Sequence, residues 1–272
     1  MNREPRVVML TSNGVRHRWA AARLAKKTNL VGIVSEAKTP VLQSSQVLPE
    51  SDRVVIEQHF EERDAVERRM LGTELKFPDT HVLEVPQGAI NTEAVFEWVQ
   101  QQLPDVIALY GTSLIKPPIL SHYDGRIINI HLGLSPYYRG SGTNFWPLVY
   151  REPEYVGATI HLAVASVDAG GMLAQLRPFA ESGDRAHELG TKTIMAGFEL
   201  MPVVLGMYVE GRLKPHQQTL SEGRVFKRKD FHAEAVRTMW RHFETGMMAE
   251  YLANAGERCQ RCPIVEIPSH VA

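Results

Sequence analysis

The sequence predicts an α/β fold: a Rossmann-like, mostly parallel open sheet that is flanked by helices and followed by a small C-terminal extension. Short apolar runs rich in valine and isoleucine alternate with longer stretches of helical periodicity along most of the chain, an order typical of βαβ units. The first unit joins a predicted strand at residues 6–10, a turn at 11–14, a helix at 20–27 and a strand at 30–35. A strand, a helix and a strand in this order imply a parallel pair.

The later elements follow the same alternation. We predict strands at residues 80–85, 106–110, 127–130, 156–167 and 172–179, and helices at 54–71, 91–103, 142–150 and 185–208, with Asn91 as an N-cap. Residues 39–52 are polar and contain prolines, which predicts a loop. We place a catalytic domain at residues 1–211 and the extension at residues 212–272, where one amphipathic helix should run through Trp240 and Tyr251.

Composition narrows the classes of protein to consider. The chain has 272 residues and a formal net charge of −1, which argues against a large nucleic-acid surface. No apolar run is long enough to span a bilayer and no signal peptide is evident, so we expect a cytoplasmic protein without a membrane partner. Cys259 and Cys262 form a single CxxC pair, which would need a ligand such as His242 or His270 to hold zinc. We expect free thiols and no bound metal. The protein could also form a homodimer.

The stretch from Arg126 to Gly140, RIINIHLGLSPYYRG, joins a predicted buried strand to a loop in which Pro136 cannot continue the ladder. Asn129 and His131 are two residues apart, so their side chains point to the same side of the pleat. Asp168 follows the next predicted strand. The three residues could supply an oxyanion donor, a proton shuttle and a carboxylate that orients and charges the imidazole. A lone Asn and His at a strand end more often satisfy loop backbone.

The ordered fragments resemble the signature of the folate-dependent formyltransferases. They are Asn129-Ile130-His131, Pro136, Arg139-Gly140, Gly157 to His161 and Asp168-Ala169-Gly170. The turn after the first predicted strand has one glycine where a dinucleotide fingerprint has three, and no GxxxxGK[ST] occurs, which disfavours NAD and P-loop phosphate binding. Gly133 departs from the serine of many family members, and Ser135 departs from the leucine of most.

The resemblance implies a formyl donor, 10-formyltetrahydrofolate, and a site without a metal. It implies that Asn129, His131 and Asp168 are catalytic, with His131 held as a cation beside Asp168. It further implies donor contacts from Leu109, Tyr110, Gly111, Leu114, Ser135, Val167 and Gly170, and acceptor contacts from Asn13, Gly14, Tyr137, Arg139 and Gly140. For residues 109–114 the alternative is core packing plus a turn. For residues 13–17 the alternative is a plain turn.

The acceptor is expected to be a primary amine on a small molecule. Residues 223–231 resemble the C-terminal extension of nucleotide-sugar formyltransferases, which favours a nucleotide-linked amino sugar; Lys227, Arg228 and Lys229 would bind its diphosphate or simply face solvent. Alternatives are an amino acid, a hydroxylamine or a peptide amine of a biosynthetic pathway, a formyltetrahydrofolate hydrolase, and a folate-binding protein that is not an enzyme. The charged helix at residues 54–71 would be a lid, an interface or a surface helix.

Overall fold

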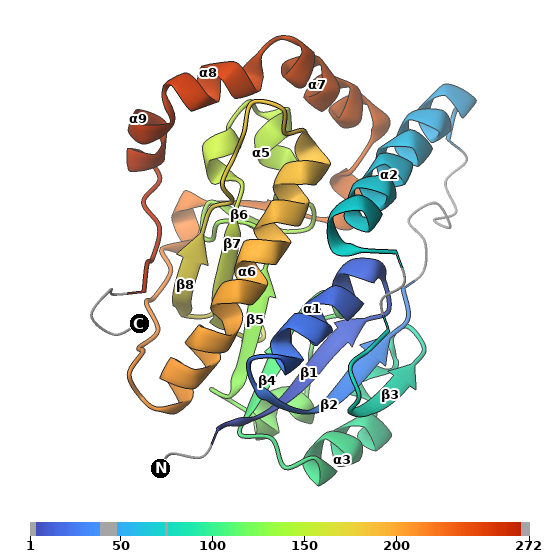
Figure 1. Ribbon diagram of the computed structural model, residues 1–272, viewed down its shortest axis with the longest axis vertical. Coiled ribbons are helices and arrows are strands. Elements are labelled where there is room, and N and C mark those ends of the chain that lie inside the picture. Colours follow the sequence, from blue (N-terminus) through green and yellow to red (C-terminus); the bar gives the residue numbers. More distant parts are fainter. Residues whose placement is uncertain (1–3, 39–47, 74–75, 268–272) are drawn as a thin grey trace.

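A twisted sheet runs through the centre of the computed structural model, which describes residues 4–38, 48–73 and 76–267 (Figure 1). Most of the loop predicted at residues 39–52 lies outside these ranges, as does His270. Within the described residues the sheet has the strand order β3-β2-β1-β4-β5-β7-β8. The strands are β1 (Arg6–Ser12), β2 (Asn29–Glu36), β3 (His81–Val85), β4 (Val106–Leu109), β5 (Ile127–His131), β7 (Ala158–Leu162) and β8 (Met172–Leu176).

The five strands from β3 to β5 are parallel to one another, whereas β7 pairs antiparallel with β5, and β8 pairs antiparallel with β7. This arrangement confirms the predicted fold class. The strand order reverses between β1 and β4, and ligands of open α/β sheets bind beyond the carboxyl ends of the strands at such a switch point. Asn129 and His131 lie on β5, next to β4 at that edge.

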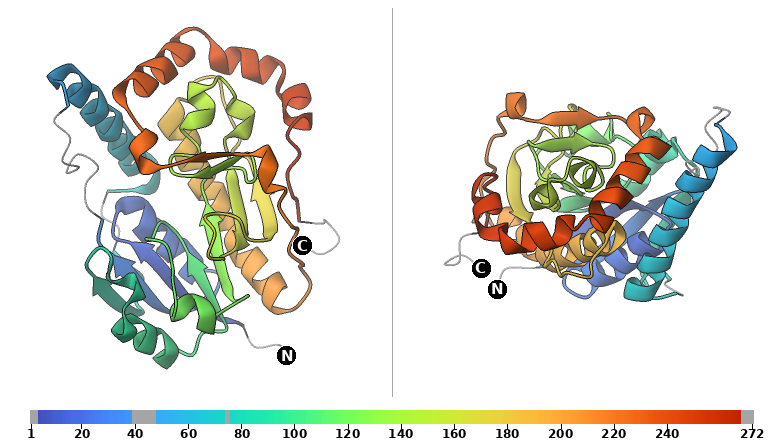
Figure 2. Two further views of the ribbon diagram at one scale, coloured as in Figure 1. Left: turned by 180° about the vertical axis from the view of Figure 1, so that it is seen from behind. Right: turned by 90° about the horizontal axis from the view of Figure 1, so that it is seen from above.

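Two hydrophobic cores hold the layers together. Helices α1 (Val15–Ala25) and α6 (Ala186–Val209) cover one face of the sheet, and α3 (Glu93–Gln101), η2 (Ala89–Asn91) and α4 (Ile119–His122) cover the other (Figure 1, Figure 2). Alternate residues of β1 serve both cores: Val7 and Met9 face α1 and α6, while Val8 and Leu10 face α3. This is the pattern of a parallel strand that is buried on both sides.

Helix α6 is long and apolar enough to cross a bilayer, by length and composition alone, which differs from the expectation drawn from the sequence. Half of its most apolar window is buried inside the protein. Phe198, Met201 and Leu205 lie in the core between this helix and the sheet. A central helix that covers a parallel sheet has the same composition, and packing accounts for its apolar face.

Several predicted boundaries differ from the structure. Helix α1 begins at Val15 instead of at residue 20, and its first turn buries His17. The strand predicted at residues 156–167 ends at Leu162, and the chain then forms the loop that carries Asp168. Asn91 does not cap α3, whose N-cap is Thr92. The Asn91 side chain instead bridges to the segment after β4, accepting from the Lys116 amide and donating to a carbonyl there.

The C-terminal segment contains several short elements where one helix was predicted. They are η4 (Leu220–Glu222), β9 (Arg224–Phe226), η5 (Arg228–Asp230), α7 (Ala233–Glu244), α8 (Met247–Ala253) and α9 (Ala255–Gln260). Strand β9 pairs in parallel with β6 (Tyr138–Gly140). The helices wrap around α5 (Trp146–Val149) and meet α2 (Glu50–Leu71), as both views in Figure 2 show. The predicted surface helix therefore packs on this segment.

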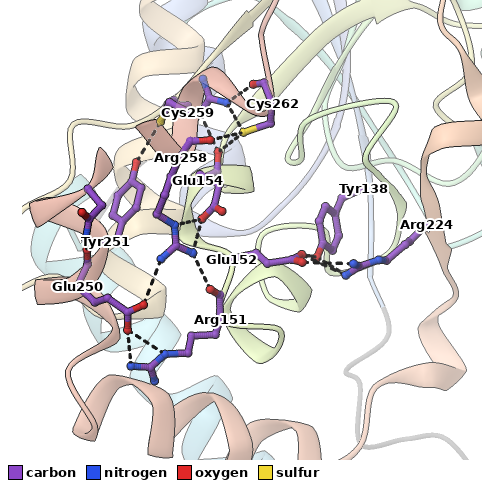
Figure 3. Close-up of polar contacts among 12 residues, drawn as sticks. Tyr138, Arg151, Glu152, Glu154, Arg224, Glu250, Tyr251, Arg258, Cys259 and Cys262 are labelled. Carbon is purple, nitrogen blue, oxygen red and sulfur yellow. Dashed lines mark hydrogen bonds and ion pairs between the residues drawn. The ribbon is translucent and has the colours of Figure 1, made fainter. Parts of the chain in front are cut away.

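A network of polar contacts attaches α8 and α9 to η3 (Pro153–Tyr155) and to the residues just before it (Figure 3). Arg258 lies 2.7 Å from the Glu154 carboxylate, and both side chains are largely buried. Arg177 donates to the buried Cys262 sulfur at 3.0 Å. Both cysteines are free thiols. Among the described residues no group of three or more His, Cys, Asp or Glu side chains is placed to hold a metal ion.

Candidate active site

The structure brings Asn129, His131 and Asp168 together at the carboxyl edge of the sheet. His131 Nδ1 lies 3.3 Å from Asp168 Oδ2. Asn129 Nδ2 lies 3.5 Å from Asp168 Oδ1. The first two residues come from β5 and the third from the loop between β7 and β8. The Asp168 carboxylate therefore contacts an imidazole through one oxygen and an amide through the other.

Asp168 is held in an unusual conformation by several contacts. Its φ angle is +46°, a value that non-glycine residues adopt rarely and at a cost in free energy. The Gly140 amide donates to Asp168 Oδ2 at 3.0 Å. Burial raises the pKa of Asp168, but His131, His161 and the Gly140 amide lower it by more, to about 2. The carboxylate is therefore anionic at neutral pH.

His131 is subject to opposing effects on its charge. Burial lowers the pKa of His131 below its usual value; the Asp168 carboxylate and the Tyr138 carbonyl raise it, but by less. Burial therefore disfavours the charged form of the ring, only 7% of whose side chain is exposed to solvent, while Asp168 favours it. Its Nε2 lies 3.2 Å from the Tyr138 carbonyl oxygen. Both ring nitrogens thus face acceptors, so a second proton on the ring would find a partner at once.

His161 belongs to the same constellation, although the sequence analysis gave it no role. Its Nδ1 lies 2.8 Å from the Leu162 carbonyl oxygen, so in the neutral ring that nitrogen carries the hydrogen. Its Nε2 then accepts from Asn129 Nδ2 at 3.1 Å. This contact fixes the Asn129 amide with its nitrogen toward Asp168 and His161. Asn129 and His161 are directly paired residues of β5 and β7, so the strand register was the signal that could have found this residue.

Close packing explains the glycine at position 133. A Cβ added there would stand 2.6 Å from Thr143 Cβ and 2.7 Å from His131 Nε2. Such distances are shorter than any real Cβ contact, so a serine at this position would displace the imidazole or Thr143. Thr159 holds the same loop, because its hydroxyl donates to the Gly133 carbonyl at 2.7 Å.

The residues predicted to contact the donor differ in exposure. Leu109, Tyr110, Ser135 and Gly170 are buried, so a ligand could meet them only through small openings or through backbone groups. Leu114 and Val167 are 48% and 45% exposed. They lie on the loops that follow β4 and β7, on either side of the end of β5 in the strand order.

The residues predicted to contact the acceptor lie in three places. Arg139 and Gly140 lie beside the Asp168 loop, since Arg139 Nη1 is 3.5 Å from the Val167 carbonyl oxygen. Tyr137 is directed elsewhere: its hydroxyl contacts the Pro263 carbonyl at 3.3 Å. Asn13 and Gly14 are exposed at the end of β1, where Gly14 is the N-cap of α1.

Lys38 and His17 lie near the start of α1, close to the side chains of Arg16 and Arg63. An ideal Cβ on Gly111 would lie 2.6 Å from His17 Nε2 and 3.4 Å from Lys38 Nζ, which puts these two nitrogens close together. Burial, with Arg16 and Arg63 nearby, lowers the pKa of Lys38 to about 8. Burial and the same neighbouring cations lower the pKa of His17 well below its usual value. Glu67 already pairs with Arg16 at 2.9 Å, and a further anion near Lys38 would relieve the remaining repulsion.

A sequence model of the family described as "Formyl transferase" matches residues 12–205, more than half of the chain. The chain belongs to the formyl transferase family. It is 29% identical over 130 residues to the phosphoribosylglycinamide formyltransferase of Escherichia coli (strain K12), a match that covers 47% of this chain and 60% of that protein. The corresponding Haemophilus influenzae protein is 28% identical over 123 residues, with 45% and 58% covered. The chain thus spans about three fifths of the length of these relatives.

Solved structures show the same fold at lower identity. Glycinamide ribonucleotide transformylase 1 from Symbiobacterium toebii has a TM-score of 0.54 and 19% identity, with 80% of this chain and 96% of that chain covered. A sugar N-formyltransferase from Shewanella sp FDAARGOS_354 has a TM-score of 0.52 and 16% identity, with 84% and 78% covered. The two formyltransferases act on different compounds by name, so the shared fold does not select an acceptor.

Proposed function

We propose that this formyltransferase moves a formyl group from 10-formyltetrahydrofolate to a primary amine of a small molecule. The observation that carries the proposal is the convergence of Asn129, His131 and Asp168, with their mutual contacts, at the sheet edge where ligands bind. The donor supplies a formyl carbon that is activated because it is bound to a nitrogen able to leave. The acceptor nitrogen forms a bond to this carbon, and the bond to the leaving nitrogen then breaks.

Asn129 would stabilise the oxyanion of the tetrahedral intermediate. One hydrogen of its amide is committed to His161 at 3.1 Å. The second points toward Asp168 at 3.5 Å, the outer limit for a hydrogen bond, so it can turn to a closer and more basic oxygen. A donor that is already oriented by its neighbours needs little reorganisation as charge develops.

His131 and Asp168 would manage the proton that the attacking amine releases. The neutral imidazole can accept this proton and pass it to the leaving nitrogen. The anionic Asp168 carboxylate, 3.3 Å away, offsets the positive charge on the ring while the proton resides there. The Tyr138 carbonyl takes the N–H at the other nitrogen. The Tyr138 side chain is itself fixed by Glu152 and by Arg224, whose Nη1 donates to its hydroxyl at 2.7 Å (Figure 3).

The surroundings of the site suit a flat, partly apolar donor. Leu114, Val164 and Val167 are between 39% and 48% exposed on the loops beside β5. Exposed aliphatic side chains next to a polar constellation are typical of pockets for heterocyclic ligands. The backbone of the loop after β4 is anchored by Glu36, which accepts from the Ser113 amide at 2.7 Å. The chain's own residues therefore offer an apolar wall and a fixed backbone edge.

The cations near α1 favour an acceptor that carries negative charge, and a nucleotide-linked amino sugar meets this requirement. Its diphosphate would lie near Lys38 and the start of α1, with the amine at Asp168. Arg228 lies close enough to Lys38 to lower the pKa of that lysine, which links the basic run of the extension to the same place. An anionic amino acid amine would satisfy the same charges, so charge alone does not separate the two acceptors.

The experiment is to measure tetrahydrofolate release from 10-formyltetrahydrofolate, first without an acceptor and then with a panel of amines. The panel holds nucleotide-linked amino sugars, amino acids, hydroxylated ornithine and peptide amines. Release that depends on one amine supports the transferase and identifies its acceptor class. Rapid release in water alone supports a hydrolase, and binding of the donor without release supports a folate-binding protein.

Variants test the assignment of roles. His131→Ala should lower kcat by about a hundredfold or more, since the proton shuttle is lost. The control is His122→Ala, which removes a histidine that lies on the exposed surface of α4. Full activity of His131→Ala with the preferred amine would contradict the proposed mechanism.

A further inference from the structure

The Gln218 side chain is hydrogen-bonded to the backbone of the turn that contains Asp168. Its Nε2 donates to the Asp168 carbonyl at 3.0 Å and to the Gly170 carbonyl at 2.6 Å. Both amide hydrogens are therefore used on two carbonyls of one turn. Gln218 lies beyond residue 205, where the match to the family ends.

This turn needs an external support. Asp168 has a φ of +46°, which costs free energy for a residue with a side chain. Gly170 is packed so tightly that an added Cβ would lie 1.8 Å from the Leu162 carbonyl oxygen. Without Gln218 the carbonyls of Asp168 and Gly170 would lose the donor that faces both of them. The contact thus stabilises a backbone conformation that the sequence of the turn does not favour by itself.

The other polar atom of Gln218 is not used within the protein. With Nε2 facing the two carbonyls, Oε1 is buried and has no hydrogen-bond partner. A buried acceptor without a partner is unfavourable for folding. Stability alone therefore does not account for a glutamine here, whereas the need for two donors at the Asp168 turn does.

The segment that contains Gln218 is attached to the rest of the protein on both sides of this residue. Contacts before Gln218 fix its position, and contacts after it reach the catalytic site. His216 pairs with Met172 through two backbone hydrogen bonds of 2.7 Å, which brings the chain after α6 back to the sheet. On the other side, Phe226 of β9 pairs with Gly140, whose amide donates to Asp168 Oδ2. The extension therefore contacts the Asp168 backbone directly and the carboxylate through one intermediary.

We propose that Gln218 is a positioning residue for formyl transfer: by holding the Asp168 turn, it sets the carboxylate against His131 and makes the C-terminal segment part of the catalytic site. This inference rests on the proposed function and extends it to a residue outside the family match. Gln218 acts through Asp168 and does not itself handle the formyl group.

The test compares Gln218→Met, which keeps the length of the side chain but cannot donate, with Gln217→Met on the exposed neighbouring residue. We expect Gln218→Met to lower kcat by about tenfold or more, while KM for the donor changes by less than about threefold. Gln217→Met should match the wild type. A kcat for Gln218→Met within about twofold of the wild type would overturn the proposal.

A second readout does not depend on turnover. In protein labelled at histidine, NMR follows the titration of His131. The Asp168 carboxylate raises the pKa of this histidine. Gln218→Met should move the His131 midpoint downward by about 0.5 pH unit or more; an unchanged midpoint would overturn the positioning role. If no amine accepts a formyl group, the proposed function fails, and the His131 titration still tests Gln218.

Gln218→Glu serves as the second variant if Gln218→Met does not fold. Its ionised carboxylate is repelled by the two carbonyl oxygens. Its protonated form has one O–H group that can donate to one of them. The ratio of its activity to that of the wild type should therefore rise as the pH is lowered, and a ratio that stays flat with pH would count against the proposal.

Discussion

Asp168→Asn removes one negative charge from the centre of the site and keeps the size of the side chain. In the folded protein the carboxylate is 12% exposed and contacts His131, His161 and the Gly140 amide. An asparagine cannot offer a charge to these groups. The substitution therefore isolates the electrostatic part of the Asp168 contacts, provided that the turn held by Gln218 keeps its shape.

The pKa of Asp168 gives the magnitude. Its contacts lower the pKa from the usual 3.8 to about 2, a difference that corresponds to about 2 kcal/mol of folding free energy. Because the folded-state pKa lies below the unfolded value, this contribution is fully present above about pH 4 and is lost as the pH falls through about 2. The small exposed fraction of the side chain keeps solvent screening low.

Urea unfolding at two pH values tests this reasoning. At pH 7 we expect Asp168→Asn to unfold with a free energy about 2 kcal/mol lower than the wild type, and at pH 3 the gap should shrink to about 1 kcal/mol. Asp79→Asn, on an exposed residue, should show no such gap. Turnover at pH 7 should fall by about a hundredfold or more while the protein remains folded. Equal stability of variant and wild type at both pH values would refute the assigned contacts.

Three further substitutions or treatments probe the site and its support. Gly133→Ser should lower turnover by about tenfold or more, because its Cβ would stand 2.6 Å from Thr143 Cβ; Thr143→Gly, which removes that Cβ, should partly restore it, and an active single variant would contradict the packing. Arg258→Met leaves the buried Glu154 without its ion pair and should cost about 3 kcal/mol in urea unfolding, whereas Arg261→Met, on an exposed pair, should cost less than about 0.5 kcal/mol. Similar costs for the two would be contrary to expectation. EDTA should leave turnover unchanged, since the described residues form no cluster of three or more metal ligands; a loss that zinc restores would show otherwise.

The parts of the site that the sequence could predict are those carried by local pattern. Asn129 and His131 share one face of a strand because of their spacing, and Asp168 follows the next long apolar run. Sequence reasoning therefore brought the three residues to one edge. Their mutual distances depend on the antiparallel pairing of β5 with β7, which the chain order alone does not fix.

The contributions that sequence reasoning missed come from contacts between distant segments. Gln218 reaches a turn that lies 50 residues earlier in the chain, and no periodicity marks such a contact. The charge state of His131 depends on how completely the ring is buried, a property of the final packing. By contrast, the break between α7 and α8 had a local signal that was overlooked: Gly246 has a φ of +82°, a conformation that glycine adopts readily after a helix.

The electrostatics of the site bear on how the proton moves. Burial disfavours a charged His131, while the Asp168 carboxylate and the Tyr138 carbonyl are already placed to receive the N–H groups of the charged form. A ligand that displaces water from this edge raises the free-energy cost of charging the buried ring. It also strengthens the attraction between the charged ring and Asp168. The ring can then gain and lose a proton within one turnover, provided that the two effects stay nearly balanced. This balance depends on the distance between His131 and Asp168, which explains why a residue that only holds the Asp168 turn can matter for catalysis.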